Sequence, residues 1–292
     1  MRPLCRVCGT ESVELGKKVG HYAHIPFVLY RCPECRFAFV DPPWSGTSAA
    51  YNEAYYQGKG VDPTVDYLFE LEAPERTVRH YEWQGLTDVV GCLTPLNPKT
   101  RWLDYGCGNG GLVRHLRRHA LADAVGFESG WIVGVSRKLG IPFLTEDEIP
   151  DYYGAFDVVT MIEVIEHVLD PIAVLRHARR LLKPNGILYL TTGNARPFRD
   201  RLLAWRYVIP EIHVGFFEPR SLETALTRTG FRPVYRVRPR GYADVLRFKI
   251  LKNLGIRKRS LLESAIPWKL VSFLADLRYQ VTYHPYGIAV SE

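Results

Sequence analysis

The stretch from Arg101 to Gly111, RWLDYGCGNGG, decides the fold of this 292-residue chain. It begins as a short apolar run and ends in glycines at positions 106, 108, 110 and 111. Glycines at this spacing let the backbone turn sharply and approach a ligand closely before a helix begins. Because dinucleotide enzymes carry a similar loop, the loop alone is compatible with several adenosine-bearing ligands.

Short apolar runs separated by amphipathic segments surround this loop. The runs are RWLDYG, AVGFES, IPFLT, FDVVTMIE, GILYLTT and FRPVYRV, and the segments between them include residues 111–120, 131–139 and 171–182. Strands alternating with helices predict an α/β fold with a parallel sheet covered on both faces. Pro184-Asn185-Gly186 is expected to end one helix and turn the chain into the next strand.

The end of the second apolar run narrows the range of possible ligands to those with a ribose. Glu128 lies about 20 residues beyond the loop, where a carboxylate can accept hydrogen bonds from both hydroxyls of a ribose. Ligands of such sheets bind outside the carboxyl ends of the strands, so residues just after each run are the candidates for the site.

Residues 101–192 resemble the class I S-adenosylmethionine-dependent methyltransferases. The match consists of DYGCGNG, then FDVVTMIEVIEHVLDP, then LLKPNGILYLTT, with further matches at Tyr51–Tyr56 and in HVGFFEPRSLETALTRTGF from His213 to Phe231. The resemblance implies a Rossmann-like seven-stranded methyltransferase sheet with helices on both faces. It also implies S-adenosylmethionine as the cofactor.

The resemblance assigns a role to each matching position. The glycine loop would contact the methionine part of the cofactor with support from Asp104, and Glu128 would hold the ribose. Glu146 or Asp147 would approach the adenine, and Glu163 would face the methionine group or the substrate. The cofactor residues so implied are Tyr56, Asp104, Gly106, Gly108, Gly110, Glu128, Glu146, Asp147 and Glu163.

Two histidines are candidates for a catalytic base. His167 and His213 lie in family-like stretches, and a neutral imidazole near pH 7 suits proton removal from a hydroxyl acceptor. A helix-capping or packing role is the alternative for each. Glu163, Glu166 and His167 also form E-x-x-E-H, similar to a metal-binding set in quinone-ring O-methyltransferases, although a solvated acidic turn is the favoured interpretation.

Aromatic residues precede the glycine loop. Tyr55 and Tyr56 are interpreted either as a lid over the cofactor or as an ordinary aromatic anchor.

Four cysteines form two pairs, Cys5-x-x-Cys8 and Cys32-x-x-Cys35. Two such turns present a tetrahedral four-sulfur shell, which predicts structural Zn²⁺ in a small zinc-ribbon-like module. Disulfides are the competing interpretation, and a reducing compartment argues against them. His21 and His24 are rival ligands that we expect at the surface. Cys92 and Cys107 are expected to be packing thiols.

The expected domain organisation has three segments. Residues 1–42 form the zinc-binding module, 43–98 a helical connector and cofactor lid with a helix over about 65–93, and 99–292 the methyltransferase domain with a basic helical insertion at about 240–284. One face of the insertion, with Ile266, Leu270, Phe273, Leu277 and Val281, is expected to pack against the main domain or a second copy of the chain.

The charge pattern allows two interpretations. The net charge is +7, and residues 232–259 hold ten Lys or Arg against a single acid, Asp244. A solvated surface is favoured over a phosphate-binding one. The chain contains no apolar run near the roughly 20 residues of a membrane span, and a cytoplasmic location is expected by default.

The leading hypothesis is methyl transfer from S-adenosylmethionine to a small molecule, at a hydroxyl or carbon of a sugar or a natural-product or glycan-pathway intermediate. The alternative is an RNA methyltransferase with a zinc module. Base N-methylation enzymes often carry Asn/Asp-Pro-Pro-Tyr where this chain reads IEVIEH (162–167), which argues against the alternative. A binding module without catalysis is a third reading. Expected partners are the acceptor and a second copy in a homodimer.

Overall fold

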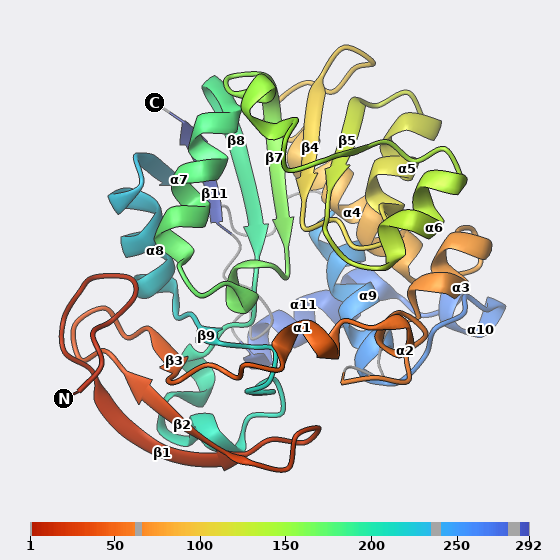
Figure 1. Cartoon of the computed structure of the whole chain (residues 1–292). Coiled ribbons are helices and arrows are strands. Elements are labelled where there is room, and N and C mark those ends of the chain that lie inside the picture. Colours follow the sequence, from red (N-terminus) through yellow and green to blue (C-terminus); the bar gives the residue numbers. More distant parts are fainter. Residues whose placement is uncertain (1, 62–65, 235–240, 280–286, 292) are drawn as a thin grey trace. The chain divides into compact units, whose positions relative to one another are not determined.

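A computed structural model describes residues 2–61, 66–234, 241–279 and 287–291 (Figure 1). The chain divides into two compact units. Unit 1 comprises residues 1–50, 152–235 and 281–292, and unit 2 comprises 51–151 and 236–280. These units differ from the three segments expected from the sequence, whose boundaries stay a prediction. Each unit is described by itself.

Unit 1 contains four sheet strands in the order β10-β11-β8-β7. β7 (Phe156–Ile162) and β8 (Leu182–Thr191) are parallel, whereas β11 (Gly287–Ser291) is antiparallel to both β8 and β10 (Phe231–Val234). α7 (Pro171–Leu181) packs on β7 and β8, and α8 (Pro219–Arg228) packs on β10 and β11. The side chain of Asp170 caps α7 by accepting the N–H of Ala173.

A second, antiparallel sheet of unit 1 has the order β1-β2-β3-β9. β1 (Val13–Val19), β2 (Pro26–Arg31) and β3 (Ala38–Val40) come from the cysteine-bearing segment. β9 (Gly215–Phe216) lies much later in the sequence than these three strands, and it pairs with β3. The unit also contains α1 (Thr47–Ala50) and the short helices η2 (Ile165–His167) and η3 (Arg196–Ala204).

Unit 2 carries three parallel strands in the order β4-β5-β6. β4 (Arg101–Tyr105) is followed by α5 (Gly111–Arg118), β5 (Asp123–Phe127) by α6 (Ile132–Lys138), and β6 (Phe143–Leu144) by η1, which begins at Ile149 and ends at Tyr152. Trp102 and Leu103 of β4 and Leu116 of α5 are fully buried. This alternation brings the glycine loop to the carboxyl end of β4.

The helical part of unit 2 comprises α2 (Glu53–Tyr56), α3 (Tyr67–Glu72), α4 (Arg79–Gly91), α9 (Tyr242–Asn253), α10 (Leu261–Ser264) and α11 (Trp268–Tyr279). The prediction of a single helix over about 65–93 is wrong. Pro74 interrupts it, because proline removes a backbone N–H and its ring clashes with the preceding turn.

The strand predictions agree with the structure with one correction. β4 to β8 form parallel pairs, whereas β10 and β11 form antiparallel pairs. Pro184-Asn185-Gly186 lies inside β8 rather than before it, at a register shift where Asn185 adopts a φ of 62°.

The basic insertion lies between β10 and β11. Two of its cations form ion pairs within unit 2 instead of facing solvent. Lys249 is buried and lies 3.1 Å from Glu82, and Arg247 pairs with Glu263. The solvated-surface interpretation is therefore wrong for these two cations. They hold helices of unit 2 together.

The helical face expected to be packed is exposed in the described part of this single chain, and its packing against a second copy stays a prediction. Ile266, Leu270 and Phe273 are 39%, 54% and 45% exposed, whereas Trp268 packs with Tyr81 and Phe248. Leu277 and Val281 lie outside the side chains described. No helix among the described residues has the length and apolarity of a membrane span. The cytoplasmic location and the homodimer stay predictions.

Candidate functional site

The glycine loop of unit 2 has the geometry that its sequence indicates. Gly106, Gly108 and Gly110 have φ values of 72°, 53° and 71°, in the left-handed region that side chains other than glycine's rarely adopt. A Cβ on Gly110 would lie 2.8 Å from Ile141 and 2.9 Å from Phe143. The loop therefore requires glycine for both conformation and space.

Glu128, at the end of β5, is hydrogen-bonded to this loop. Its Oε2 accepts the N–H of Gly108 at 3.1 Å, and its Oε1 accepts those of Ser129 at 2.9 Å and Gly130 at 3.0 Å. Three backbone donors thus orient the half-buried carboxylate, and Oε2, which accepts only one of them, keeps a lone pair for a further donor. This carboxylate fits a ribose hydroxyl group.

Tyrosines line the same part of unit 2. Tyr56 is buried, and its hydroxyl lies 1.8 Å from the place that a Cβ on Gly130 would occupy. Burial and the nearby charge of Glu128 raise the pKa of Tyr56 above its usual range, so its hydroxyl stays protonated. The ring of Tyr67, which the sequence did not single out, lies 3.1 Å from a Cβ built on Gly108.

A buried polar network holds the loop to α3. The amide of Asn109 donates to the carbonyl of Tyr67 and to Oε2 of Glu70, both at 3.0 Å, and its oxygen accepts the N–H of Gly111 at 2.9 Å. Glu70 in turn accepts from Arg79 at 2.9 Å. Sequence reasoning missed this network because Asn109 looked like a variable position between glycines.

Three other predicted cofactor residues have contrasting environments. Asp104 is buried at the end of β4, whereas Glu146 and Asp147 are exposed after β6. Burial and the charge of Glu146 raise the pKa of Tyr105, the last residue of β4. The roles assigned to these acids stay proposals.

A second cluster lies in unit 1, where β7 ends. Glu163 adopts a φ of 56°, and its N–H donates to the carbonyl of Thr191 at 3.0 Å. Its carboxylate accepts from the Thr191 hydroxyl at 3.2 Å, and its Oε2 lies 3.2 Å from the hydroxyl oxygen of Tyr207. The left-handed conformation is costly for a residue with a Cβ and is typical of functional sites.

Glu166 lies at the centre of this cluster. It is fully buried, its Oε1 accepts from the Tyr207 hydroxyl, and burial and the charge of Glu163 raise its pKa to about 8. The interpretation of E-x-x-E-H as a solvated acidic turn is therefore wrong for Glu166. Tyr207, which follows η3, was missed because no motif surrounds it.

The two predicted bases lie together. The rings of His167 and His213 are 4.7 Å apart, and that of His213 is 4.3 Å from Tyr207. Nδ1 of His167 lies 2.9 Å from the carbonyl of Ile212, and Nδ1 of His213 lies 2.5 Å from that of Tyr207. A carbonyl requires a donor, so each neutral ring carries its proton on Nδ1 and has Nε2 as the acceptor.

These side chains also match a metal-ligand pattern. One ligand atom each from Glu166, His167 and His213 falls within 4.8 Å of the others. This set differs from the one implied by the resemblance, because His213 takes the place of Glu163. Histidines that donate Nδ1–H to a carbonyl are a common arrangement around metal ions.

The raised pKa of Glu166 makes a testable prediction. Because its folded pKa of about 8 exceeds the usual 4.5, the folded state holds this proton more tightly, and stability falls as pH rises from 4.5 through 8. Glu166→Gln mimics the protonated carboxyl. We expect thermal scans to show a Tm decrease of at least about 4 °C over this range in the wild type and a flatter profile in the variant.

The exposed variant Glu223→Gln is the control and should keep the wild-type slope. Parallel Tm profiles for the wild type and Glu166→Gln would contradict the protonation of Glu166.

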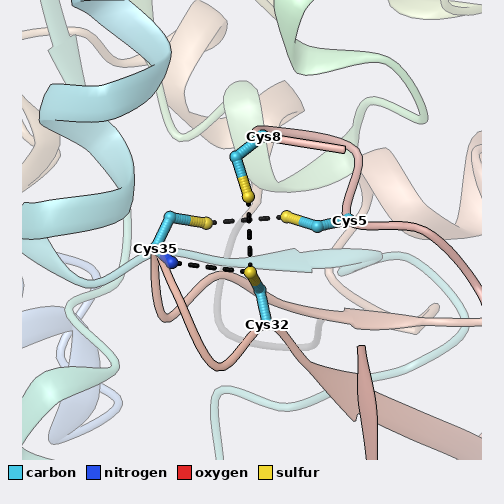
Figure 2. Close-up of side chains that lie close together, drawn as sticks. All are labelled: Cys5, Cys8, Cys32 and Cys35. Atoms are coloured by element: carbon cyan, nitrogen blue, oxygen red, sulfur yellow. Dashed lines mark hydrogen bonds between the residues drawn. The ribbon is translucent and has the colours of Figure 1, made fainter. Parts of the chain in front are cut away.

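The four paired cysteines of unit 1 converge on one point (Figure 2). Cys5 Sγ lies 3.5 Å from Cys35 Sγ, and Cys8 Sγ lies 3.3 Å from Cys32 Sγ. A disulfide would bring sulfurs to about 2.05 Å, whereas a zinc ion with bonds of about 2.3 Å separates them by about 3.8 Å. The donor set therefore fits zinc better than disulfides.

The remaining cysteines and the two rival histidines lie outside this cluster. His21 and His24 are exposed, as expected. Cys92 is also exposed, so the prediction that it is a packing thiol is wrong. Burial raises the pKa of Cys107 well above its usual range, which agrees with a packing thiol.

Comparison with known proteins places this geometry in a family. A family model described as a methyltransferase domain matches residues 76–236, more than half of the chain. A ubiquinone biosynthesis O-methyltransferase of Xanthomonas oryzae is 37% identical over 106 residues, 33% of this chain and 44% of that protein. Its counterpart in Xanthomonas axonopodis is 36% identical over 181 residues, 56% of this chain and 75% of that protein.

The chain spans less than half the length of the first relative, so the activity of the whole protein does not follow from it. Among solved structures, one of the Haloferax volcanii Trm112 methyltransferase activator in complex with a methyltransferase matches with a TM-score of 0.54 at 18% identity. The match covers 84% of this chain and 97% of that one, and it shows the fold. The chain belongs to the methyltransferase domain family, with a Rossmann-like fold.

Proposed function

We propose that this protein transfers the methyl group of S-adenosylmethionine to a hydroxyl of a small molecule. The observation that carries the proposal is the loop of left-handed glycines tied to Glu128. Gly106, Gly108 and Gly110 would hold the methionine part of the cofactor, and Glu128 would accept from a ribose hydroxyl. When bound, the cofactor supplies an activated sulfonium methyl group, so the protein must orient the acceptor and exclude water.

The cluster of unit 1 supplies proton-accepting groups suited to a hydroxyl acceptor. His213 and His167 each present Nε2 as the acceptor. We propose His213 or His167 as the base that takes the hydroxyl proton as the oxygen–methyl bond forms. Tyr207 holds Glu166 and His213 through its hydroxyl and its carbonyl.

The acceptor class rests on two lines of support. The relatives that match are named ubiquinone biosynthesis O-methyltransferases, which favours oxygen over carbon and a ring hydroxyl among the acceptors. A base-bearing cluster also suits a hydroxyl, whose proton must leave. A sugar or natural-product hydroxyl, including a glycan-pathway intermediate, belongs to the same chemical class.

RNA is the less favoured acceptor. The basic insertion was the main support for it, and Arg247 and Lys249 pair with buried acids of unit 2. Arg257 lies 3.5 Å from Asp66. Cations engaged in this way contribute little to binding phosphates.

We further infer that the four paired cysteines hold a structural zinc ion. Their sulfurs converge as a closed set, which leaves no coordination position for chemistry.

The proposed base makes a kinetic prediction. His213→Ala should lower kcat about 100-fold or more, because general-base catalysis contributes roughly 10² to 10⁴ in rate. The Kd for S-adenosylmethionine should change little. Steady-state methyl transfer and calorimetric titration of the same preparation measure the two quantities.

The exposed His21→Ala is the matched control and should retain the wild-type kcat. Full activity in both His213→Ala and His167→Ala would rule out histidine as the base.

The direct test of the proposed function is product detection. The protein would be incubated with methyl-labelled S-adenosylmethionine and a panel of catechols, phenols, nucleotide sugars and transfer RNA. We expect label in a hydroxyl-bearing small molecule. Label in RNA alone would replace this proposal with the alternative.

A further inference from the structure

A hydrophobic cluster of the cysteine-bearing segment of unit 1 continues into another part of the chain. Phe27, Leu29, Ala38 and Val40 from this segment form one buried cluster with Ala195, Leu202, Val208 and Phe216. The half-buried ring of Tyr207, which binds Glu166, packs against the same cluster. We use the name cysteine module for residues 1–42. The interior of the cysteine module is thus shared with residues 195–216.

Glu211 is the main polar connection between the two segments. Its side chain is fully buried, and Oε1 accepts the N–H groups of Tyr22 at 2.7 Å and Ala23 at 3.0 Å. A Cβ on Gly20 would lie 2.3 Å from this oxygen, so the hairpin of the cysteine module closes directly on the carboxylate. Nearby, Lys18 Nζ donates to the carbonyl of Trp205 at 2.9 Å.

Strand pairing continues this connection to the catalytic cluster. The N–H of Val40 donates to the carbonyl of Val214 at 3.1 Å, and the N–H of Val214 donates to the carbonyl of Glu166 at 2.8 Å. Val214 therefore bonds β3 through one of its groups and the Glu166 turn through the other. Val214 directly follows His213. The residue before His213 is Ile212, whose carbonyl binds His167.

A cysteine is hydrogen-bonded to the residue that precedes β3. The N–H of Cys32 donates to the carbonyl of Phe37 at 2.8 Å, and the Phe37 ring lies 4.7 Å from that of Phe217. A Cβ on Gly215 would lie 2.9 Å from the Phe37 ring. A metal ion bound by Cys32 and Cys35 would therefore hold the strand on which residues 214–217 rest.

We propose that the cysteine module positions the catalytic cluster, with Glu211 as the positioning residue. The module holds residues 205–217 on one side while the Glu166 turn binds them on the other. Tyr207 and His213 are thereby fixed with respect to Glu166 and His167. The catalytic consequence rests on the proposed function, but the coupling is a property of unit 1 and is measurable without substrate.

Hydrogen exchange of the zinc-loaded full chain tests this coupling. In Glu211→Ala, peptides covering 205–217 should exchange at least about tenfold faster than in the wild type, with one zinc per chain retained. Glu211→Gln should restore slow exchange, because its amide oxygen still accepts both N–H groups. Glu14→Ala, an exposed site in the same module, is the control and should match the wild type. Removal of zinc by a chelator should also accelerate exchange in 205–217.

A spectroscopic signal separates positioning from general destabilisation. The Cε1–H resonance of His213, assigned by its loss in His213→Gln, should move in Glu211→Ala and stay in place in Glu14→Ala. If Glu211→Ala does not fold, Lys18→Met replaces it. Hydrogen exchange in residues 205–217 should then be faster in Lys18→Met than in the wild type.

Wild-type exchange and an unmoved His213 resonance in a folded Glu211→Ala or Lys18→Met protein would overturn the proposal. Acceleration spread evenly over the whole chain would overturn it as well. Absence of methyl transfer by the wild type, with the exchange pattern as expected, would instead count against the proposed function alone.

Discussion

Glu128→Ala is expected to weaken S-adenosylmethionine binding roughly 10- to 100-fold. The carboxylate would accept from a ribose hydroxyl, and a hydrogen bond to a charged group contributes about 1.5–3 kcal/mol. The substitution also removes the acceptor of the Gly108 N–H within the glycine loop. Calorimetric titration of the folded variant measures the loss as an increase in Kd.

Two control substitutions test whether the weaker cofactor binding is specific to Glu128. Glu146→Ala removes an exposed acid assigned only to the adenine edge, and we expect a smaller effect. Gly134→Ala lies on α6, where a Cβ meets nothing within 4 Å, and should bind like the wild type. An unchanged Kd for Glu128→Ala would show that the ribose is held elsewhere.

Cys8→Ser is expected to produce the largest loss of stability. Cys8 is only half-buried, so the exchange of sulfur for oxygen costs little apart from the metal bond. Structural zinc contributes folding free energy directly, and its loss should lower Tm by about 10 °C or more. Metal analysis should show about one zinc per wild-type chain and much less in the variant.

The chain provides a matched control for this experiment. Cys92 is exposed and belongs to unit 2, whereas the four paired cysteines belong to unit 1, so Cys92→Ser should keep both the zinc content and the Tm. Equal Tm values for Cys8→Ser and the wild type, with zinc absent from both, would contradict a structural metal.

The features that could be predicted from sequence depend on short-range patterns. The left-handed glycines at 106, 108 and 110 are separated by single residues, and the paired cysteines repeat one spacing. Glu128 was found because it ends the next apolar run. Such features depend on the backbone of one turn or strand, which neighbouring residues determine.

The missed features depend on contacts between distant segments. Tyr207 binds Glu166, 41 positions earlier, and Asn109 binds Glu70, 39 positions earlier. Neither pair has a characteristic spacing, and a tyrosine or asparagine alone has no pattern. The shared core of the cysteine module could not be predicted either, because periodicity shows which face is apolar and not what covers it.

Contacts between distant segments also explain why the packing and the ion pairs of the basic insertion could not be predicted. Helical periodicity placed Ile266 and Leu270 on an apolar face, but the packed side of α11 is the one with Trp268. The many cations suggested a surface, whereas the acids that bind Lys249 and Arg257 lie far away in sequence. Charge counts do not identify partners.

The most direct test of the central claim is calorimetric titration of the purified, folded wild-type chain with S-adenosylmethionine. The account predicts saturable binding with one cofactor per chain, and competition by S-adenosylhomocysteine at the same site. A folded protein that gives no saturable heat with either compound would contradict the assignment of the glycine loop and Glu128 to the methyl donor.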